Sequence, residues 1–364
     1  MRFPEFSGEW ETKSINDLAD VIGGGTPDTT VKSYWDGGIQ WFTPSEIGKN
    51  KFVDASLRTI TEDGLNNSSA KLLPPNTILL SSRATIGECS LSLRECATNQ
   101  GFQSLVSKKC NVDFLYYLIQ TKKKDLIRKS CGSTFLEISA NEVRKIQVSV
   151  PSDVEQQKIA GLLSLIDKRI ATQNKIIEKL QSLIKGLRVC CMQRVYGNNV
   201  YLSEIAQIYQ PQTISSTELT EDGFLVYGAN GIIGKYKDYN HETEQICITC
   251  RGNTCGMVNY TKPMSWITGN AMVINTDKYQ DKVCKRYLYH YLSAYNFNSI
   301  ISGSGQPQIV RTPLEKLKIT LPTISEQKQK AIIFDKIQDK IDINHKVLNL
   351  YIGQKQYLLR QMFI

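Results

Sequence analysis

The sequence predicts an α+β protein built from two repeated α/β modules, each followed by a long helix, with the two helices paired as an antiparallel coiled coil. Three observations support this prediction. The chain has 364 residues, more than one ordinary domain. Pro151 and Pro322, which are 171 residues apart, occupy the same place in two similar segments. After each proline, apolar residues recur at heptad spacing, which is typical of a coiled coil. We expect the first module over residues 1–151, the first helix over 152–195, the second module over 196–322 and the second helix over 323–364.

The repeat extends upstream into both modules. Residues 143–156 read VRKIQVSVPSDVEQ and residues 314–327 read LEKLKITLPTISEQ. An Arg…Gly element at 83–87 has its counterpart at 251–256. Short apolar runs broken by Gly, Asn, Pro and Ser predict a strand-rich module. Two shorter helices are expected, near residues 113–123 and 285–294.

The sequence also indicates where each long helix begins. Ser152 with Glu155, and Thr323 with Glu326, have the spacing of a capping box, which satisfies the first backbone amides of a helix. Apolar residues then alternate at steps of three and four, which predicts a heptad seam. The seam of the first helix is Leu163, Ile166, Ile170, Ile177, Leu180, Ile184 and Leu187, and that of the second is Phe334, Ile337, Ile341, Leu348, Tyr351, Lys355 and Leu358.

Polar residues interrupt this seam. Gln173 and Asn344 occupy matched positions, and we expect them to face each other, because a buried polar pair fixes register at a cost in stability. Tyr351 and Lys355 stand where the first helix has leucine and isoleucine, so they either continue the pairing or face a partner subunit. The alternative for both helices is ordinary amphipathic packing on their own modules. Paired antiparallel helices of about 60 Å would place one module at each end.

Composition favours a globular protein with a polyanionic partner. Lys and Arg number 44 against 35 Asp and Glu, so the net charge is +9, and 41% of the residues are hydrophobic. No apolar run approaches the length of a membrane span, and the first residues do not resemble a signal peptide. We therefore expect a cytoplasmic protein without membrane contact. The ten cysteines lack the spacing of a disulfide framework and are expected to be reduced and buried.

No catalytic motif is present in the sequence. It contains neither a P-loop nor the Asn/Asp-Pro-Pro-aromatic signature of amino-methyltransferases, and its three histidines are too scattered to predict an acid–base site. Cys247 and Cys250, with Cys255 and His241 nearby, leave a zinc hydrolase as an alternative. The strand-like run around the first two cysteines favours buried thiols instead. We expect a protein that is not an enzyme and holds no metal or other cofactor itself.

Loops rich in aromatic, amide and hydroxyl side chains recur in both modules and predict a surface that binds DNA. Asn and Gln pair with adenine edges, Arg pairs with guanine, and Lys contacts phosphates. Whether Arg83 and Arg251 contact bases, phosphates or their own module is left open. The candidates in the first module are Lys32, Tyr34, Trp41, Thr43, Ser45, Arg83, Thr85, Asn99, Gln100, Gln103 and Ser133. Those in the second module are Tyr227, Asn230, Lys235, Arg251, Asn253, Asn270, Ser304, Gln306 and Gln308.

Along its whole length the chain resembles the specificity (S) subunit of type I restriction–modification systems. The resemblance rests on the duplicated module-plus-helix plan and on the Pro…Glu-Gln motifs that end at Gln156 and Gln327. The Arg–Gly elements at 82–87 and 249–256 are also similar to those of the family. The module openings Asp17-Leu18-Ala19 and Glu204-Ile205-Ala206 add to the resemblance.

This resemblance implies two target recognition domains joined by antiparallel spacer helices, with no catalytic centre. It also implies partners: two methyltransferase subunits that hold S-adenosylmethionine, and two ATP-dependent translocase–nuclease (restriction) subunits, with ATP and Mg²⁺ expected on partner chains. Two different modules would read a bipartite, asymmetric target in double-stranded DNA, and the helices would set the unread spacer. The alternative is a coiled-coil adaptor whose modules bind proteins, which predicts no salt-dependent DNA affinity.

Overall fold

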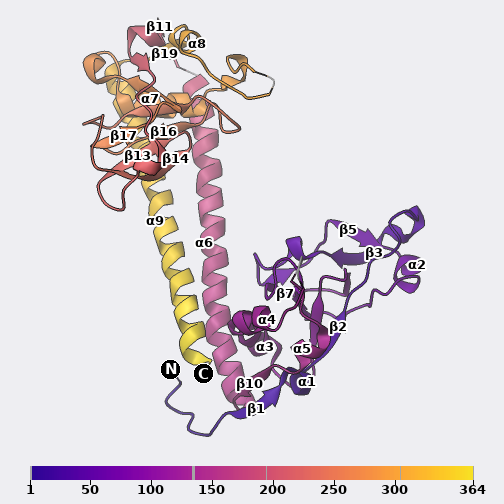
Figure 1. The fold of residues 1–364 in the computed structure, drawn as a ribbon. Helices are drawn as coiled ribbons and strands as arrows, with labels where there is room; N and C mark the ends of the chain where they lie inside the picture. The colour runs from indigo at the N-terminus through magenta and orange to yellow at the C-terminus, as the bar shows by residue number, and fades with distance from the viewer. Residues whose placement is uncertain (1, 133–135, 194, 304, 364) are drawn as a thin grey trace. The chain divides into compact units, whose positions relative to one another are not determined.

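The computed structural model describes residues 2–132, 136–193, 195–303 and 305–363 (Figure 1). They form two compact units. The first unit comprises Met1–Asn174 and Val347–Ile364, and the second comprises Lys175–Lys346. There are two long helices, α6 (Asp153–Gln193) and α9 (Ile324–Met362). Each has one end in the first unit and the other end in the second. No described helix combines the length and the apolar character that a membrane crossing requires.

The first unit contains two sheets. The larger sheet has the strand order β2-β9-β6-β7-β4, and the smaller has β5-β3-β8, in which β3 and β8 run parallel. A separate antiparallel ribbon pairs β1 with β10. The strands are β1 (Glu11–Ser14), β2 (Ala19–Gly23), β3 (Trp35–Phe42), β4 (Phe52–Val53), β5 (Arg58–Ile60), β6 (Ile78–Leu80), β7 (Cys89–Ser92), β8 (Cys96–Thr98), β9 (Gln103–Ser107) and β10 (Gln147–Val150). The helices of this unit before α6 are α1 (Ile15–Leu18), α2 (Glu62–Asn66), α3 (Val112–Thr121), α4 (Lys123–Arg128) and α5 (Ala140–Arg144), with the 3₁₀ turns η1 (Lys32–Tyr34) and η2 (Pro44–Glu46).

The second unit contains sheets of the same kind. Its larger sheet has the order β12-β18-β15-β16, its smaller has β14-β13-β17 with β13 and β17 parallel, and a ribbon pairs β11 with β19. The strands are β11 (Asn198–Tyr201), β12 (Gln207–Tyr209), β13 (Phe224–Gly228), β14 (Gly231–Tyr236), β15 (Ile246–Thr249), β16 (Val258–Tyr260), β17 (Ser265–Ile267), β18 (Ala271–Asn275) and β19 (Lys318–Leu321). The helices of this unit before α9 are α7 (Lys285–Ala294) and α8 (Arg311–Glu315), with the 3₁₀ turns η3 (Leu202–Glu204), η4 (Ser216–Glu218), η5 (Asp277–Tyr279) and η6 (Phe297–Ser299).

The shared topology confirms the repeat. In each unit the strand that enters the module pairs with the strand that precedes the long helix, β1 with β10 and β11 with β19. Each unit also has a hairpin in its larger sheet, β6–β7 or β15–β16, and one parallel pair in its smaller sheet. The helix expected at 285–294 is α7. The helix expected at 113–123 ends at Thr121, because Lys122 leaves the helical conformation before α4 begins.

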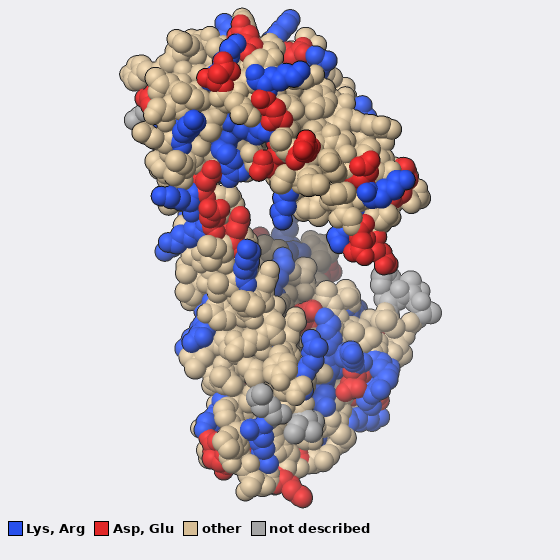
Figure 2. All heavy atoms as spheres, turned by 90° about the vertical axis from the view of Figure 1, so that its left-hand side faces the viewer, with Lys and Arg blue, Asp and Glu red and all other residues tan. Residues whose placement is uncertain are grey.

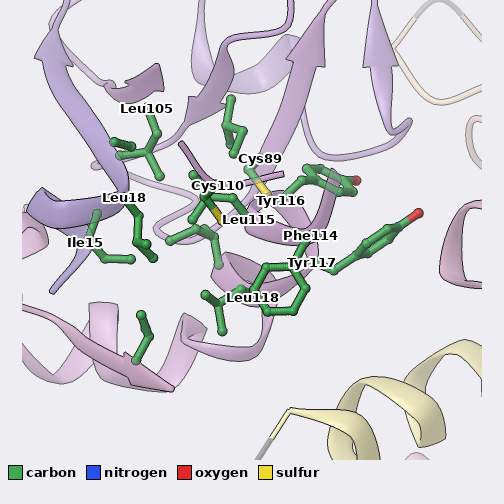
Figure 3. Packing of buried hydrophobic residues seen from close by; sticks show 14 of the residues in the cluster. Ile15, Leu18, Cys89, Leu105, Cys110, Phe114, Leu115, Tyr116, Tyr117 and Leu118 are labelled. Carbon is green, nitrogen blue, oxygen red and sulfur yellow. The ribbon is translucent and has the colours of Figure 1, made fainter. Parts of the chain in front are cut away.

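Helix α3 lies at the centre of the core in the first unit. All six of its residues from Phe114 to Ile119 are buried. Figure 3 shows side chains of this helix among those of Ile15, Leu18 and Leu105, which come from α1 and β9. The same cluster includes Leu163 of α6, so α3 buries one face against the sheet and another against the long helix. Each large apolar side chain buried in this way contributes about 1.5–3 kcal/mol.

The cysteines follow the prediction only in part. All ten are free thiols, and five of them are buried. Burial raises the pKa of the Cys89 and Cys110 thiols to about 12. Cys131 and Cys190 are exposed, so the expectation that the cysteines are buried is wrong for these two. Each follows or ends a helix at the surface, a position that composition alone does not reveal.

The long helices run antiparallel within each unit, as predicted. In the first unit Lys355 of α9 forms a 2.8 Å ion pair with Asp167 of α6. In the second unit the Lys330 ammonium near the start of α9 donates to the Cys191 carbonyl near the end of α6, at 3.4 Å. The start of α6 therefore lies beside the end of α9, and the end of α6 lies beside the start of α9.

The structure shows what the polar residues of the seam contact within each unit. Lys355 pairs with α6, and the Arg169 guanidinium lies 5.8 Å from the centre of the Tyr351 ring, so both polar seam residues continue the helix pairing. The alternative that they face a partner subunit is not supported. Gln173 is buried, and the side chain of Asn344 donates to the Lys340 carbonyl one turn earlier. These last two belong to different units, so their expected pairing stays a prediction.

The two long helices begin differently. Thr323 and Glu326 form the reciprocal capping box that the sequence predicts. At the other helix Glu155 is buried, and its two carboxylate oxygens each accept a 2.7 Å hydrogen bond from the guanidinium of Arg2. The capping role expected for Glu155 is replaced because a bidentate, charge-assisted pair is stronger than a bond to a neutral amide.

The glutamine after each of these glutamates has the same role in both units. The Gln156 side chain donates to the Pro151 carbonyl at 2.9 Å and accepts from the Asn111 amide at 3.0 Å. Gln327 donates to the Pro322 carbonyl at 3.0 Å and accepts from the Cys284 amide at 2.8 Å. Each glutamine thereby ties the first turn of a long helix to the start of α3 or α7.

A polar network joins three helices inside the second unit. His290 of α7 is fully buried, with its Nδ1 2.9 Å from an Arg188 nitrogen of α6 and its Nε2 2.7 Å from an Asp335 oxygen of α9. Arg286 of α7 pairs with the same carboxylate at 2.5 Å. These partners indicate that Nε2 carries the imidazole proton, because Arg188 can only donate to Nδ1. Burial, together with the positive charge of Arg188, lowers the pKa of His290, although its bond to Asp335 acts in the opposite direction.

Candidate nucleic-acid interface

In each unit a tight loop follows a buried strand of the larger sheet and carries an arginine. In the first unit the loop closes where the Ser81 amide donates to the Glu88 carbonyl at 2.9 Å and the Gly87 amide donates to the Ser81 carbonyl at 3.1 Å. In the second unit the Thr249 and Gly256 groups make the equivalent bonds at 2.8 and 2.9 Å. Gly87 and Gly256 both have φ near +90°, which favours glycine and explains why the motif requires one.

A second segment crosses each arginine loop at its base. The Ser82 backbone accepts from the Ile138 amide at 3.1 Å and donates to the Gly101 carbonyl at 2.8 Å. Cys250 makes the same two bonds in the second unit, from Ile309 at 3.0 Å and to Asn270 at 3.2 Å. The arginine loop, the residues before β9 or β18, and the residues before α5 or α8 are thus joined at one edge of each unit. We call this edge the loop edge, comprising 81–88, 99–103 and 131–138 in the first unit and 249–257, 268–270 and 302–309 in the second, as far as they are described.

The smaller sheet delivers further polar residues to the loop edge. Parallel strands end at the same side of a sheet, and here the Asn99 amide after β8 donates to the Phe42 carbonyl at the end of β3, at 3.1 Å. The Thr268 amide after β17 donates to the Tyr227 carbonyl of β13, at 2.9 Å. Residues that follow these strands therefore lie beside the arginine loop.

Most candidates predicted from the sequence are placed at this edge. In the first unit Thr85 and Gln100 are exposed and Arg83 and Asn99 are half-buried on the loop edge, and the candidates Thr43 and Ser45 follow β3 beside it. In the second unit Arg251, Asn253, Asn270, Gln306 and Gln308 are exposed on the loop edge, and Asn230 is exposed in the turn after β13. The structure thus gathers on one edge residues that are separated by up to about 80 positions in the sequence.

Hydrogen bonds hold several of these side chains in place. The Thr26 hydroxyl lies 2.5 Å from the Gln100 amide oxygen, and the Asn99 side chain accepts from the Gly101 amide at 2.9 Å. The Thr85 hydroxyl donates to Ser81 at 3.0 Å, and the Thr43 hydroxyl caps η2 through Glu46. Such bonds preorganise the loops for a ligand, which reduces the entropy lost on binding.

Three other candidates, Lys32, Tyr34 and Lys235, do not meet on the loop edge. Lys32 is exposed and Tyr34 half-buried on η1, which packs beside α2. Lys235 on β14 is half-buried and lies 3.5 Å from Asp222. Gln103, in contrast, belongs to the loop edge; it is half-buried at the start of β9, and its side-chain oxygen has no hydrogen-bond partner among the described residues.

Trp41 and Tyr227 are core residues, which corrects their prediction as surface contacts. The Trp41 indole nitrogen donates to the Gly25 carbonyl at 2.9 Å, and the ring packs edge-on against Trp35. The Tyr227 hydroxyl accepts from the Lys262 amide at 3.1 Å. A buried side chain whose polar atom is already paired offers no group to a ligand, so neither belongs to the interface. The candidates Ser133 and Ser304 lie outside the described residues.

Glu137 also belongs to this edge, although it is not among the candidates predicted from the sequence. Its carboxylate lies 2.8 Å from the Arg83 guanidinium. Its counterpart 171 positions later is Gln308, which occupies the equivalent backbone position beside Arg251. The repeat contained this signal, because the offset of 171 residues that aligns Pro151 with Pro322 also aligns Glu137 with Gln308.

The residues of the zinc alternative have other partners. Cys247 and Cys250 are buried in and just after β15, and burial raises the pKa of the Cys247 thiol. The His241 ring lies 2.8 Å from the Tyr209 hydroxyl and 2.6 Å from the Asn240 side chain. Among the described residues no three His, Cys, Asp or Glu side chains are placed to hold a metal ion.

Charge alone does not mark the interface. Figure 2 shows Lys and Arg scattered over the face in view, with Asp and Glu interspersed among them. The loop edges are therefore identified by their repeated backbone geometry and their amide, hydroxyl and arginine side chains.

Comparison with known proteins agrees with the duplicated fold. The family model described as "Type I restriction modification DNA specificity domain" matches residues 7–182 and 198–350. The type I restriction enzyme MjaIX specificity subunit of Methanocaldococcus jannaschii is 39% identical over 180 residues, which are 47% of this chain and 42% of that subunit. The EcoprrI specificity subunit of Escherichia coli is 27% identical over 355 residues, which are 90% of this chain and 87% of that subunit.

A solved structure has the same fold. The crystal structure of the type I restriction–modification S subunit from M. genitalium matches with a TM-score of 0.65 at 17% identity, over 100% of this chain and 99% of that one. The family model matches twice, and the two matches together cover most of the chain. The chain therefore belongs to the family of type I restriction–modification DNA specificity subunits.

Proposed function

We propose that this chain reads a bipartite, asymmetric sequence in double-stranded DNA, one half with each unit. The observation that carries the proposal is the loop edge, which occurs twice with the same backbone bonds and with different side chains. Equal scaffolds support equal docking on DNA, and different side chains support different base preferences. The proposed recognition domains are residues 1–151 and 196–322, and the proposed spacer helices are 152–195 and 323–364.

Within the complex this chain supplies sequence recognition, and the chemistry belongs to other chains. We propose two methyltransferase subunits, which hold S-adenosylmethionine, as its direct partners. Two restriction subunits, which use ATP and Mg²⁺, complete the proposed assembly.

Exposed apolar residues on the long helices support this assembly. On α6 they are Val154, Leu165, Ile176 and Leu183, and on α9 they are Ile332, Ile333, Ile343, Leu350, Ile352 and Tyr357. The four residues of α6 form one row, and Ile332, Ile343, Leu350 and Tyr357 form one row on α9. The spacings within each row are eleven or seven residues, close to three or two full helical turns, so each row follows one side of its helix. Solvent-exposed rows of this kind are typical of a helix that binds a partner.

Sequencing the methylated bases of cells that carry this chain with the methyltransferase of its own system tests the proposal. We expect methylated adenines in one split, asymmetric motif, and we expect Arg83→Ala to change one half of that motif and leave the other half as in the wild type. An active methyltransferase whose pattern is unaffected by this chain would refute the proposal.

A measurement of DNA affinity distinguishes the proposed function from the alternative of a protein-binding adaptor. Under our proposal the complex binds a duplex carrying the motif, and the affinity falls steeply as salt rises from 50 to 200 mM. An adaptor that binds only proteins shows neither effect. A duplex with a scrambled motif is the matched control.

A further inference from the structure

The residue that faces the arginine differs between the two loop edges. In the first unit Arg83 forms a backbone bridge with Glu137, and the Arg83 Nη2 lies 2.8 Å from a Glu137 oxygen. In the second unit Arg251 forms the equivalent bridge with Gln308. The next backbone bridge is equivalent in the two units. Glu137 also pairs with Cys131, and Gln308 pairs with Ser302, which lies 171 positions after Cys131. One substitution, Glu against Gln, therefore changes the charge that faces each arginine.

The ion pair restricts how Arg83 can move. Its side chain is 42% exposed and that of Glu137 is 37% exposed. The Arg83 Nε is buried without a hydrogen-bond partner among the described residues, and Nη2 is already paired. The guanidinium is therefore held through Nη2. A planar guanidinium held in this way is suited to directional bonds with a base edge.

Arg251 has a different environment. Its side chain is exposed, and among the described residues no carboxylate lies within 4.0 Å of its guanidinium. The facing Gln308 amide is neutral, so it offers Arg251 no ion pair like that between Glu137 and Arg83. Such a cation is suited to a phosphate, whose attraction is not directional and which releases a counterion on contact.

We infer that Glu137 positions Arg83 to read a base edge, whereas Arg251, opposite the neutral Gln308, contacts a phosphate. Glu137 is a positioning residue that acts through Arg83. The inference rests on the proposed function, because both arginines must lie against DNA. It assigns different tasks to two residues that sequence alignment makes equivalent.

Reciprocal substitutions test the inference. The full chain, in complex with the methyltransferase subunits of its own system, is titrated with a labelled duplex that carries the methylated motif, at several salt concentrations. Glu137→Gln releases Arg83 from its ion pair so that it can contact a phosphate, and we therefore expect the slope of log affinity against log salt to steepen by about 0.9. We also expect the preference for the correct first half-site to fall about ten-fold. Gln308→Glu should make the slope shallower by about 0.9 and leave the preference at both half-sites unchanged.

The arginine variants provide a second readout. Arg251→Ala should weaken binding to all duplexes alike and reduce the salt slope by about 1, whereas Arg83→Ala should abolish half-site preference with little change in slope. Asp54→Asn is the matched control, because Asp54 pairs with Arg94 at 2.7 Å at the other end of β7. It should leave slope and preference unchanged.

The outcomes separate the inference from the function on which it depends. If the wild-type complex binds its motif and the two reciprocal variants share the wild-type slope and preference, the inference is wrong and the proposed function stands. If the wild-type complex shows no preference for the motif, both fail. The thermal unfolding of each variant is measured as a control. A midpoint equal to that of the wild type establishes that the differences arise from DNA contacts and not from misfolding.

Discussion

The ion pair between Lys355 and Asp167 is expected to contribute strongly to the stability of the first unit. The two side chains are only 17% and 15% exposed, and their charged atoms are 2.8 Å apart. Asp167 also accepts a 2.6 Å hydrogen bond from the Tyr117 hydroxyl of α3. Lys355→Met keeps the aliphatic stem and removes the charge, so it leaves Asp167 as a buried carboxylate with a neutral partner. The pair joins α9 to α6, so its loss weakens the contact between the two helices in this unit.

The size of this effect follows from the burial. Removing one partner of a fully buried pair costs about 3–5 kcal/mol. Both groups here retain some exposure, and the Lys51 ammonium lies 3.2 Å from the same Tyr117 hydroxyl, so we expect about 2–3 kcal/mol. The first unit has about 190 residues, which corresponds to an unfolding entropy of about 0.4 kcal/mol/K. The midpoint of its thermal unfolding should therefore fall by about 5–7 °C.

Calorimetry of the single and double variants provides the assay. In the cycle of Lys355→Met and Asp167→Asn, the double variant should be more stable than additivity predicts, by about 1–3 kcal/mol. Lys13→Met is the matched control, because the Lys13–Glu11 ion pair is also 2.8 Å long but is largely exposed. Its midpoint should equal that of the wild type. A Lys355→Met midpoint within 1 °C of the wild type, or strict additivity in the cycle, would refute the reasoning.

Three further predictions concern the helix junctions and the spacer. Gln327→Ala should destabilise the second unit by about 2–4 kcal/mol, because it strands a buried amide and a buried carbonyl, and urea unfolding measures the loss. The folded-state pKa of His290 lies below its ordinary value, so as pH falls below about 6.5 the unfolded chain takes up the proton first and the second unit loses up to about 1.4 kcal/mol per pH unit. His290→Gln should remove that dependence from a series of unfolding curves between pH 5 and 8, leaving the part due to His241, whose pKa burial also lowers. Inserting seven residues into α6 after Asn174 and into α9 after Lys346 adds about 10 Å to each helix, so the methylated motif should keep both halves and gain about three base pairs between them. An unchanged spacing would contradict the proposed role of the helices.

The local parts of the fold were predictable from short stretches of sequence. The capping box at Thr323 and the heptad seam depend on residues within a few turns of one helix, so their spacing predicts their structure. The repeat predicted the second unit from the first, because equal patterns of apolar and turn residues favour equal topology. Polar residues in the seam were ambiguous, since Lys355 is compatible with a helix pair only if an acidic residue faces it, and that residue lies almost 190 positions away.

The candidate site was predicted as a set of loops but not as a set of contacts. Trp41 and Tyr227 have the composition of a recognition surface and are nevertheless buried, because a neighbouring backbone group in each unit satisfies the ring's polar atom. Glu155 has the spacing of a capping residue and instead binds Arg2, which comes from the other end of the module.

Sequence by itself determined that this protein is a duplicated module with an apolar helical seam, because both features are periodic patterns along the chain. The tertiary structure alone decided which polar side chains remain available to DNA and what charge faces each of them. Arg83 and Arg251 are equivalent in the repeat, and only the folded loops show that one is paired with Glu137 and the other faces Gln308. The physical reason is that the electrostatic interaction between two side chains decreases with their distance in space. The sequence records only their distance along the chain.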